Sequence, residues 1–276
     1  MTDVDTIASA SRRLANEARQ EILKMIHKAR ASHVGSALSV VDILSTLYSG
    51  AANISHINQK SPERDIIVVS KGHASAALYS ILALKGFFPK DWLERYCGNG
   101  SELGGHVTHS NVPGVEFSTG SLGHGLPYGL GIQLSRKLSG VDGKTFVIMS
   151  DGECDEGTTW ESALIANHHK IGRLVVIVDR NRLQSMGDTE DTLALEPFAQ
   201  KWLSFGWKVF EIDGHDYQEI FESANLDYAD TPICIIANTT KGKGVTFMEH
   251  SVLWHYKTPT EIELVQGLAE LEHQKS

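Results

Sequence analysis

Cysteine is scarce in this 276-residue sequence, and runs of basic residues are absent. The three cysteines, Cys97, Cys154 and Cys234, are widely spaced and odd in number, so they indicate neither a disulfide framework nor a zinc site. This pattern favours a reducing compartment. The net charge is -9, and Lys and Arg do not cluster, which argues against a nucleic-acid partner because phosphate binding needs grouped cations.

Long apolar runs are also missing. We expect no membrane-spanning helix, because no run approaches the roughly twenty apolar residues that a span needs. Residues 1–14 are polar and lack the apolar core of a signal peptide, so a cytoplasmic protein without a membrane partner is expected. The 41% apolar content suffices for a packed core, and no repeat, low-complexity tract or linker divides the chain. We therefore predict a single domain over residues 1–276.

Short apolar runs that alternate with helical patterns predict the fold class. The pattern indicates an α/β fold with a doubly wound, mainly parallel sheet and helices on both faces. Strands are expected over 66–69, 145–149, 174–178, 207–212 and 232–237, and helices over 8–30, 155–170, 217–226 and 259–273. The turn Asp213-Gly214-His215-Asp216 is expected to cap a helix, with His215 fixing a loop rather than acting in catalysis.

Polar residues follow two of these strands. Asp151 and Gly152 come after the strand 145–149, and Asn181 follows the strand 174–178, thirty residues after Asp151. Because the carboxyl ends of parallel strands meet at the ligand-binding edge of such a sheet, the two side chains should lie close together. A carboxylate and a side-chain amide are hard oxygen ligands, which suit Mg²⁺ or Ca²⁺. Gly152 lets a phosphate approach the backbone. The sequence thus predicts a metal-diphosphate clamp.

Two motifs carry a resemblance to a known family. The segment Ser150-Asp151-Gly152-Glu153-Cys154-Asp155-Glu156-Gly157, followed by Asn181-Arg182-Leu183, resembles the signature of thiamine diphosphate enzymes in its transketolase form. Ser150 stands where the family usually has glycine. The resemblance extends from His33 to His255, and the loop 120–125 is similar to that of split, two-subunit transketolases. It implies thiamine diphosphate as cofactor, held through Mg²⁺ or Ca²⁺.

The resemblance also implies roles for individual residues in cofactor binding. The metal ligands would be Asp151, Asn181 and the carbonyl oxygen of Leu183. The residues implied to contact the cofactor are His73, Gly120, Leu122, Gly152, Glu153, Asn181, Lys241 and His255.

Four histidines and two acids are implied to act in catalysis. By resemblance, His33, His73, His106 and His255 supply protons and hydrogen bonds to the substrate. Glu156 and Glu161 align with acids near a subunit interface that share protons between paired active sites; the alternative is a solvated helix face. Tyr256 stands where the family commonly has glycine.

The implied activity is transfer of a two-carbon ketol unit from a ketose, or ketose phosphate, to an aldose or aldose phosphate. The partner implied is a separate C-terminal transketolase subunit that carries the pyrimidine-binding domain and the activating glutamate. Two copies of each chain would form a heterotetramer. The sequence leaves the sugar open.

Three other functions share part of this pattern. An α-ketoacid dehydrogenase first component or a deoxyxylulose phosphate synthase would share the clamp but should lack the four histidines. A non-catalytic thiamine diphosphate-binding module would have no use for substrate-facing histidines. A nicotinamide-binding domain fits the strand pattern, but no Gly-X-Gly-X-X-Gly follows the first strand.

Overall fold

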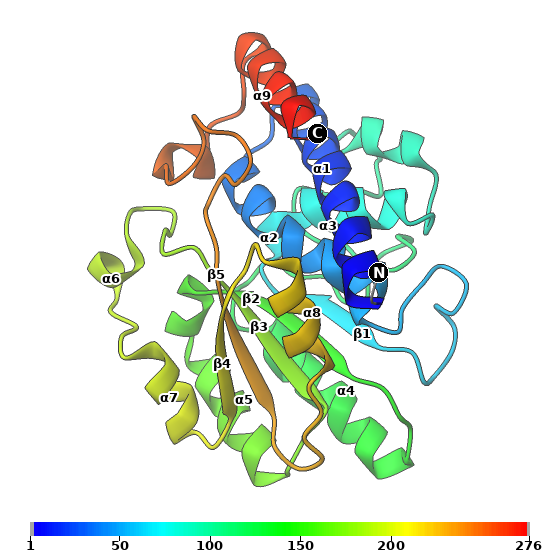
Figure 1. Ribbon diagram of the computed structural model, residues 1–276, viewed down its shortest axis with the longest axis vertical. Helices are drawn as coiled ribbons and strands as arrows, with labels where there is room; N and C mark the ends of the chain where they lie inside the picture. Colours follow the sequence, from blue (N-terminus) through cyan, green and yellow to red (C-terminus); the bar gives the residue numbers. More distant parts are fainter. Residues whose placement is uncertain (1–2, 275–276) are drawn as a thin grey trace.

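A five-stranded parallel sheet forms the centre of the computed structural model, which describes residues 3–274 (Figure 1). The strands lie in the order β1-β2-β3-β5-β4, and each neighbouring pair is parallel. Their bounds are β1 Ile66–Val69, β2 Thr145–Ser150, β3 Leu174–Arg180, β4 Lys208–Asp213 and β5 Ile233–Asn238. All five predicted strands are present, and the predicted fold class is confirmed.

Helices cover both faces of the sheet (Figure 1). One face carries α1 Asp3–Ala29, α2 Val34–Thr46, α3 Ser75–Leu84, α8 Tyr217–Asn225 and α9 Glu261–His273; the other carries α4 Gly125–Ser139, α5 Gly157–His168 and α7 Phe198–Ser204. The short helix α6, Thr189–Thr192, lies in the connection after β3. The chain steps from β1 to β4 in one direction across the sheet and from β4 back to β5 in the other, so right-handed crossovers place α4, α5 and α7 on one face and α8 on the other.

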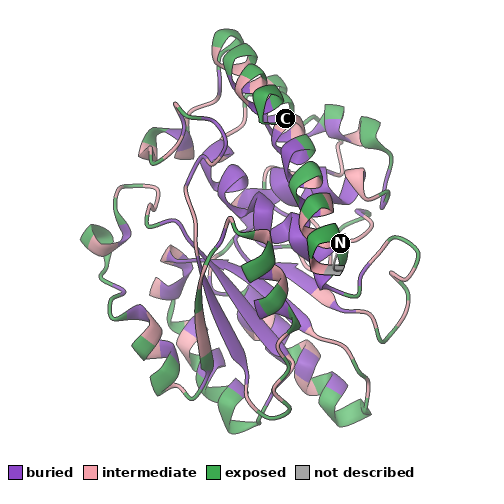
Figure 2. Cartoon of the chain, viewed as in Figure 1, coloured by how far each residue is buried: buried purple, intermediate pink, exposed green. Residues whose placement is uncertain are grey.

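The central strands are buried (Figure 2), and alternate residues of each strand pack into two separate cores. In β2, Phe146 and Ile148 pack with the helices of the α1 face, while Val147 and Met149 pack with those of the α4 face. Because both faces are covered, the strands are continuous apolar runs rather than alternating ones.

One apolar stretch is longer than the sequence analysis expected. Residues Val34–Ala51 form an 18-residue helical segment with a mean hydropathy of 1.3, long and apolar enough to cross a membrane by length and composition alone. In this fold 89% of that segment is buried, and every residue of α2 lies in the interior. Packing on α1, α3 and α8 accounts for its composition.

The helix expected over 155–170 begins later. A 3₁₀ turn at Gly152–Asp155 follows β2, and Glu156 has extended backbone angles, so α5 starts at Gly157. The turn keeps the polar residues after β2 at the carboxyl edge of the sheet.

Gly129 on α4 allows the helix to approach β2. A β-carbon at Gly129 would lie 2.5 Å from Val147 Cγ2 and 3.3 Å from Thr145 Cγ2, whereas one at the exposed Gly131 would meet nothing within 4 Å. We expect Gly129→Ala to lower the free energy of unfolding by about 1–3 kcal/mol through overpacking. Gly131→Ala should raise it by up to about 1 kcal/mol, because alanine is the better helix former. Urea denaturation measures both, and equal stabilities would contradict the packing described.

Candidate active site

A cavity of about 220 Å³ lies at the carboxyl edge of the sheet. Its lining includes ten residues that the sequence analysis named for the site: His33, His73, His106, Gly120, Leu122, Asp151, Gly152, Asn181, Leu183 and His255. It also includes Ser36, Ser150, Gln184, Ser185 and Tyr256. Segments far apart in the chain therefore meet here, as the carboxyl ends of parallel strands allow.

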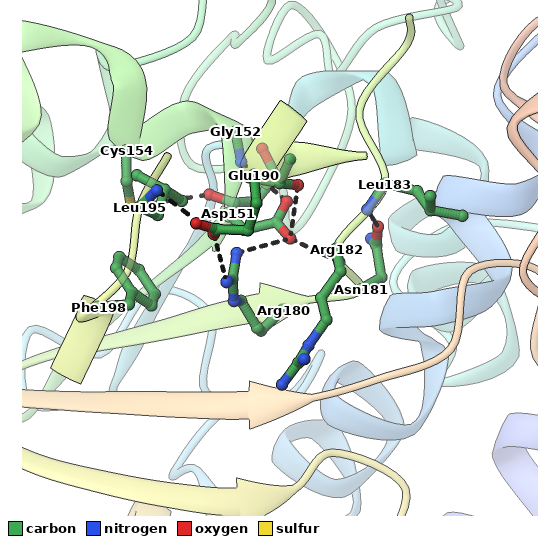
Figure 3. Close-up of polar contacts among 12 residues, drawn as sticks. Asp151, Gly152, Cys154, Arg180, Asn181, Arg182, Leu183, Glu190, Leu195 and Phe198 are labelled. Atoms are coloured by element: carbon green, nitrogen blue, oxygen red, sulfur yellow. Dashed lines mark hydrogen bonds and ion pairs between the residues drawn. The ribbon is translucent and has the colours of Figure 1, made fainter. Parts of the chain in front are cut away.

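The two clamp residues are held by backbone amides (Figure 3). Asp151 is 2% exposed; its Oδ1 accepts a hydrogen bond from Gly152 N at 2.8 Å, and its Oδ2 accepts one from Arg182 N at 2.7 Å. Asn181 Oδ1 accepts from Leu183 N at 3.1 Å. Burial raises the pKa of Asp151, because the backbone donors offset only part of the desolvation.

Arg180, which the sequence analysis did not single out, lies behind the clamp (Figure 3). Its side chain is 2% exposed, and Nη1 lies 3.6 Å from Asp151 Oδ2. Nη2 contacts Glu190 at 2.9 Å and Glu196 at 3.0 Å. Arg180 thereby ties the segment around α6 to the base of the clamp. In the sequence, only the position of Arg180 next to Asn181 pointed to a place at the site.

The donor set fits a hard divalent cation. Within residues 3–274, no three His, Cys, Asp or Glu side chains group as metal ligands. The candidate ligands are instead one carboxylate, one amide oxygen and one carbonyl, the types that Mg²⁺ and Ca²⁺ take together with water and phosphate oxygens. The buried Asp151 carboxylate, which lies 3.6 Å from the Arg180 guanidinium, would gain a closer counter-charge from such an ion. The Leu183 carbonyl accepts a hydrogen bond from Lys241 Nζ at 2.9 Å, so a metal there would compete with this lysine.

Four histidine rings converge on the cavity. The His33 ring centroid lies 5.5 Å from those of His73 and His106 and 5.1 Å from that of His255, and His73 lies 5.8 Å from His255. His33 has left-handed backbone angles, φ 74°, and its N–H donates to the carbonyl of His255 at 2.7 Å. The structure thus brings all four predicted histidines together.

Three of these rings are held in the neutral state. Burial, with His106, Lys241 and Lys71 nearby, lowers the pKa of His33 to about 4. Burial and Lys241 lower the pKa of His255 to about 3, and burial and Lys71 lower that of His73 well below its ordinary value. A neutral imidazole both donates and accepts a hydrogen bond, so each of the three rings can bind a ligand hydroxyl in either role near pH 7.

Two buried lysines lie behind the residues that line the cavity. Lys241 is fully buried; its Nζ donates to the carbonyls of Leu183 at 2.9 Å and Gln184 at 3.1 Å and lies 3.0 Å from His255 Nδ1. Burial and Lys71 lower the pKa of Lys241 to about 8. Lys71, missed by the sequence analysis, is fully buried in an ion pair with Asp179. Both lysines place positive charge beside the clamp.

The three predicted acids outside the clamp do not line the cavity. Glu153 is fully buried behind the cavity wall, where its carboxylate accepts from the Ser70 hydroxyl and from Gly123 N at 2.9 Å. It fixes the loop that contains Leu122 rather than lining the cavity. Glu156 and Glu161 are exposed, at the start of α5 and on it. The structure does not bring these two acids to the four histidines.

Comparison with known proteins identifies the family. The family described as "Transketolase, thiamine diphosphate binding domain" matches residues 10–258. The chain belongs to the transketolase family. It is 39% identical over 255 residues to an apulose-4-phosphate transketolase subunit of Phocaeicola vulgatus, covering 92% of this chain and 90% of that protein. It is 37% identical over 260 residues to the 6-deoxy-6-sulfo-D-fructose transketolase subunit SqwG of a Clostridium species, covering 94% of each.

Longer transketolases share the fold. The crystal structure of transketolase from Campylobacter jejuni superposes with a TM-score of 0.89 at 30% identity, covering 96% of this chain but 43% of that one. Rat transketolase is 30% identical over 244 residues, which are 88% of this chain and 39% of that protein. This chain therefore corresponds to less than half of these transketolases.

The low pKa of His33 predicts a pH dependence of stability. The unfolded chain binds a proton at His33 near pH 6.5, but the folded chain does so only near pH 4. The contribution of neutral His33 to the free energy of unfolding is thus complete above pH 6.5 and is lost as the pH falls toward 4. We expect His33→Gln to flatten the fall in unfolding free energy over this range, measured by urea denaturation. His168→Gln, at the exposed end of α5, is the control; an unchanged slope in His33→Gln would contradict the assignment.

Proposed function

We propose that this chain is the diphosphate-binding subunit of a two-component transketolase, which uses thiamine diphosphate and Mg²⁺ to transfer a two-carbon ketol unit from a ketose to an aldose. The observation that carries the proposal is the convergence of four histidines beside the Asp151–Asn181 donor pair, in a chain of the transketolase family. A purely cofactor-binding module would not need the histidines.

The cavity residues fit the proposed cofactor. Asp151, Asn181 and the Leu183 carbonyl would hold the metal, and Lys241 would neutralise diphosphate charge. A β-carbon at Gly152 would lie 2.9 Å from Gln184 Cδ, so glycine keeps the backbone open where phosphate would approach. Gly120, which lies next to His106, and Leu122 also line the cavity and would contact the ring system. The bound cofactor would supply the carbanion chemistry of ketol transfer.

The histidines would move protons and orient the sugar. His255 touches Lys241 and would bridge the diphosphate and the substrate, with His73 beside it. His106 is exposed at the cavity and, with His33 at 5.5 Å, would bind substrate hydroxyls. Neutral imidazoles can take a proton from a hydroxyl and return it to a developing alkoxide, which contributes about 10²–10⁴-fold in rate.

A second chain is part of the proposal. Asp151 is the one carboxylate among the described lining residues, and backbone amides already engage both of its oxygens. The activating glutamate would therefore come from a separate subunit with the pyrimidine-binding domain, in a two-plus-two heterotetramer. Two relatives of similar length are themselves named as transketolase subunits, which supports this arrangement. Glu156 and Glu161 would share protons across the interface, since α5 exposes them beside Leu164 and Ile165.

The substrate is proposed only by class. Relatives are named for apulose-4-phosphate and for 6-deoxy-6-sulfo-D-fructose, one sugar with a phosphate group and one with a sulfo group. The lining residues that the structure describes include no arginine or lysine to bind such an anionic end. We infer a ketose donor whose anionic end is recognised largely by the partner subunit.

The clamp is tested by paired substitutions. Asp151→Asn keeps the shape but removes the charge, and Asn181→Ala removes the amide oxygen; each should weaken Mg²⁺-dependent binding of thiamine diphosphate by more than about tenfold. Titration calorimetry measures the affinity, with circular dichroism to verify folding. Asp155→Asn is the matched control, since Asp155 contacts Gln184 but does not line the cavity. Wild-type affinity in both clamp variants would refute the site.

The partner requirement is tested by reconstitution. The purified chain, saturated with Mg²⁺ and thiamine diphosphate, should show ketol transfer at least about 10²-fold slower than with the partner, because the activating carboxylate is missing. A ketol-transfer assay with and without the partner measures this. Robust turnover by the chain alone would exclude the two-component arrangement.

A further inference from the structure

A buried polar cluster lies on the α1 face, outside the cavity. Arg19 on α1 contacts Asp42 on α2 through two hydrogen bonds of 3.0 and 2.6 Å, and the two residues are 6% and 2% exposed. Tyr217 donates its hydroxyl to Asp42 Oδ1 at 2.7 Å, and His215 Nδ1 lies 2.7 Å from Asp42 Oδ2. Although burial opposes it, Arg19 and His215 hold the pKa of Asp42 below its ordinary range. The cluster therefore contains a fully charged carboxylate.

The other side of this cluster holds the loop 239–244. Thr240 N donates to His215 Nε2 at 2.8 Å, and Arg19 Nε donates to the carbonyl of Lys243 at 3.0 Å. Because Nε2 accepts this bond, the His215 proton is on Nδ1 and is donated to Asp42. The charged carboxylate thus selects the tautomer that can bind Thr240.

Lys241 lies between these two attachment points. Its Nζ makes the cavity contacts described above, to the carbonyls of Leu183 and Gln184 and to His255. The loop turns sharply at Gly242, φ 82°, where a β-carbon would lie 2.2 Å from the carbonyl oxygen of Met248. A shift of the loop backbone would therefore move the buried ammonium relative to the clamp.

We propose that His215 is a positioning residue: through the Asp42-selected tautomer it holds Thr240, and so sets where the Lys241 ammonium stands for the diphosphate. The identity of the ligand in this inference rests on the proposed function. The role of His215 in placing the loop does not depend on that function. The same Asp42 offers a matched control, because Tyr217 binds its other oxygen without touching the loop.

The test compares four variants of the full chain. His215→Ala removes the acceptor for Thr240, His215→Asn can still donate to Asp42 but is too short to reach Thr240, and His215→Gln restores an acceptor near the position of Nε2. Tyr217→Phe perturbs Asp42 alone. We expect His215→Ala and His215→Asn to weaken Mg²⁺-dependent thiamine diphosphate binding by about tenfold, as one lost hydrogen bond allows. His215→Gln and Tyr217→Phe should remain within about twofold of wild type.

Hydrogen exchange of the Thr240 amide gives a second readout that needs no ligand. Exchange should be faster in His215→Ala and His215→Asn than in wild type, and unchanged in Tyr217→Phe. If His215→Ala fails to fold, His215→Asn serves in both measurements. Wild-type exchange and affinity in the variants without an acceptor would overturn the inference. Absence of binding by the wild-type chain would instead count against the proposed function, while the exchange data would still decide the positioning role.

Discussion

The buried ion pair between Lys71 and Asp179 is the constraint on which the site depends. Both side chains are fully buried, one just after β1 and the other near the end of β3. Lys71 also donates to the Ser36 carbonyl at 3.2 Å, and Asp179 accepts from the hydroxyls of Ser39, at 2.6 Å, and Thr239. Buried charges are tolerated only when paired and hydrogen-bonded, so these four segments must keep a fixed separation. They are the segments that carry His33, His73 and Lys241.

The cavity differs in charge from the chain as a whole. The net charge is -9, yet Lys71 and Lys241 lie beside the histidines, and burial together with these two cations lowers the pKa of His33 and His255. Local placement, rather than total charge, therefore determines what the cavity can bind. Burial, together with the same two cations that suit a polyanionic ligand, keeps these imidazoles neutral, the form that both donates and accepts a hydrogen bond.

In the acidic segment after β2, one short turn places four acidic side chains in four different environments. The 3₁₀ turn at Gly152–Asp155 directs Asp151 to the cavity, buries Glu153 against Ser70 and Gly123, and leaves Glu156 exposed. Asp155 contacts Gln184, which lines the cavity. Because such a turn has about three residues per turn, neighbouring acids point in different directions. Similar residue types in one motif thus have unlike surroundings.

The sequence by itself determined the strands, the order of strand and helix, and the position of Asp151 and Asn181 at the same edge of the sheet. Periodicity and strand-end position are local signals, and parallel strands bring their carboxyl ends to one edge. Resemblance to transketolases added the four histidines. Only the tertiary structure decided that Lys71 pairs with Asp179, 108 residues away. It also decided that Arg180 lies next to Asp151 and that Lys241 donates a hydrogen bond to the Leu183 carbonyl. The fold also buries the Glu153 side chain against Ser70 and Gly123. These contacts join residues distant in the chain, and their geometry depends on how helices and loops pack, which no local pattern encodes.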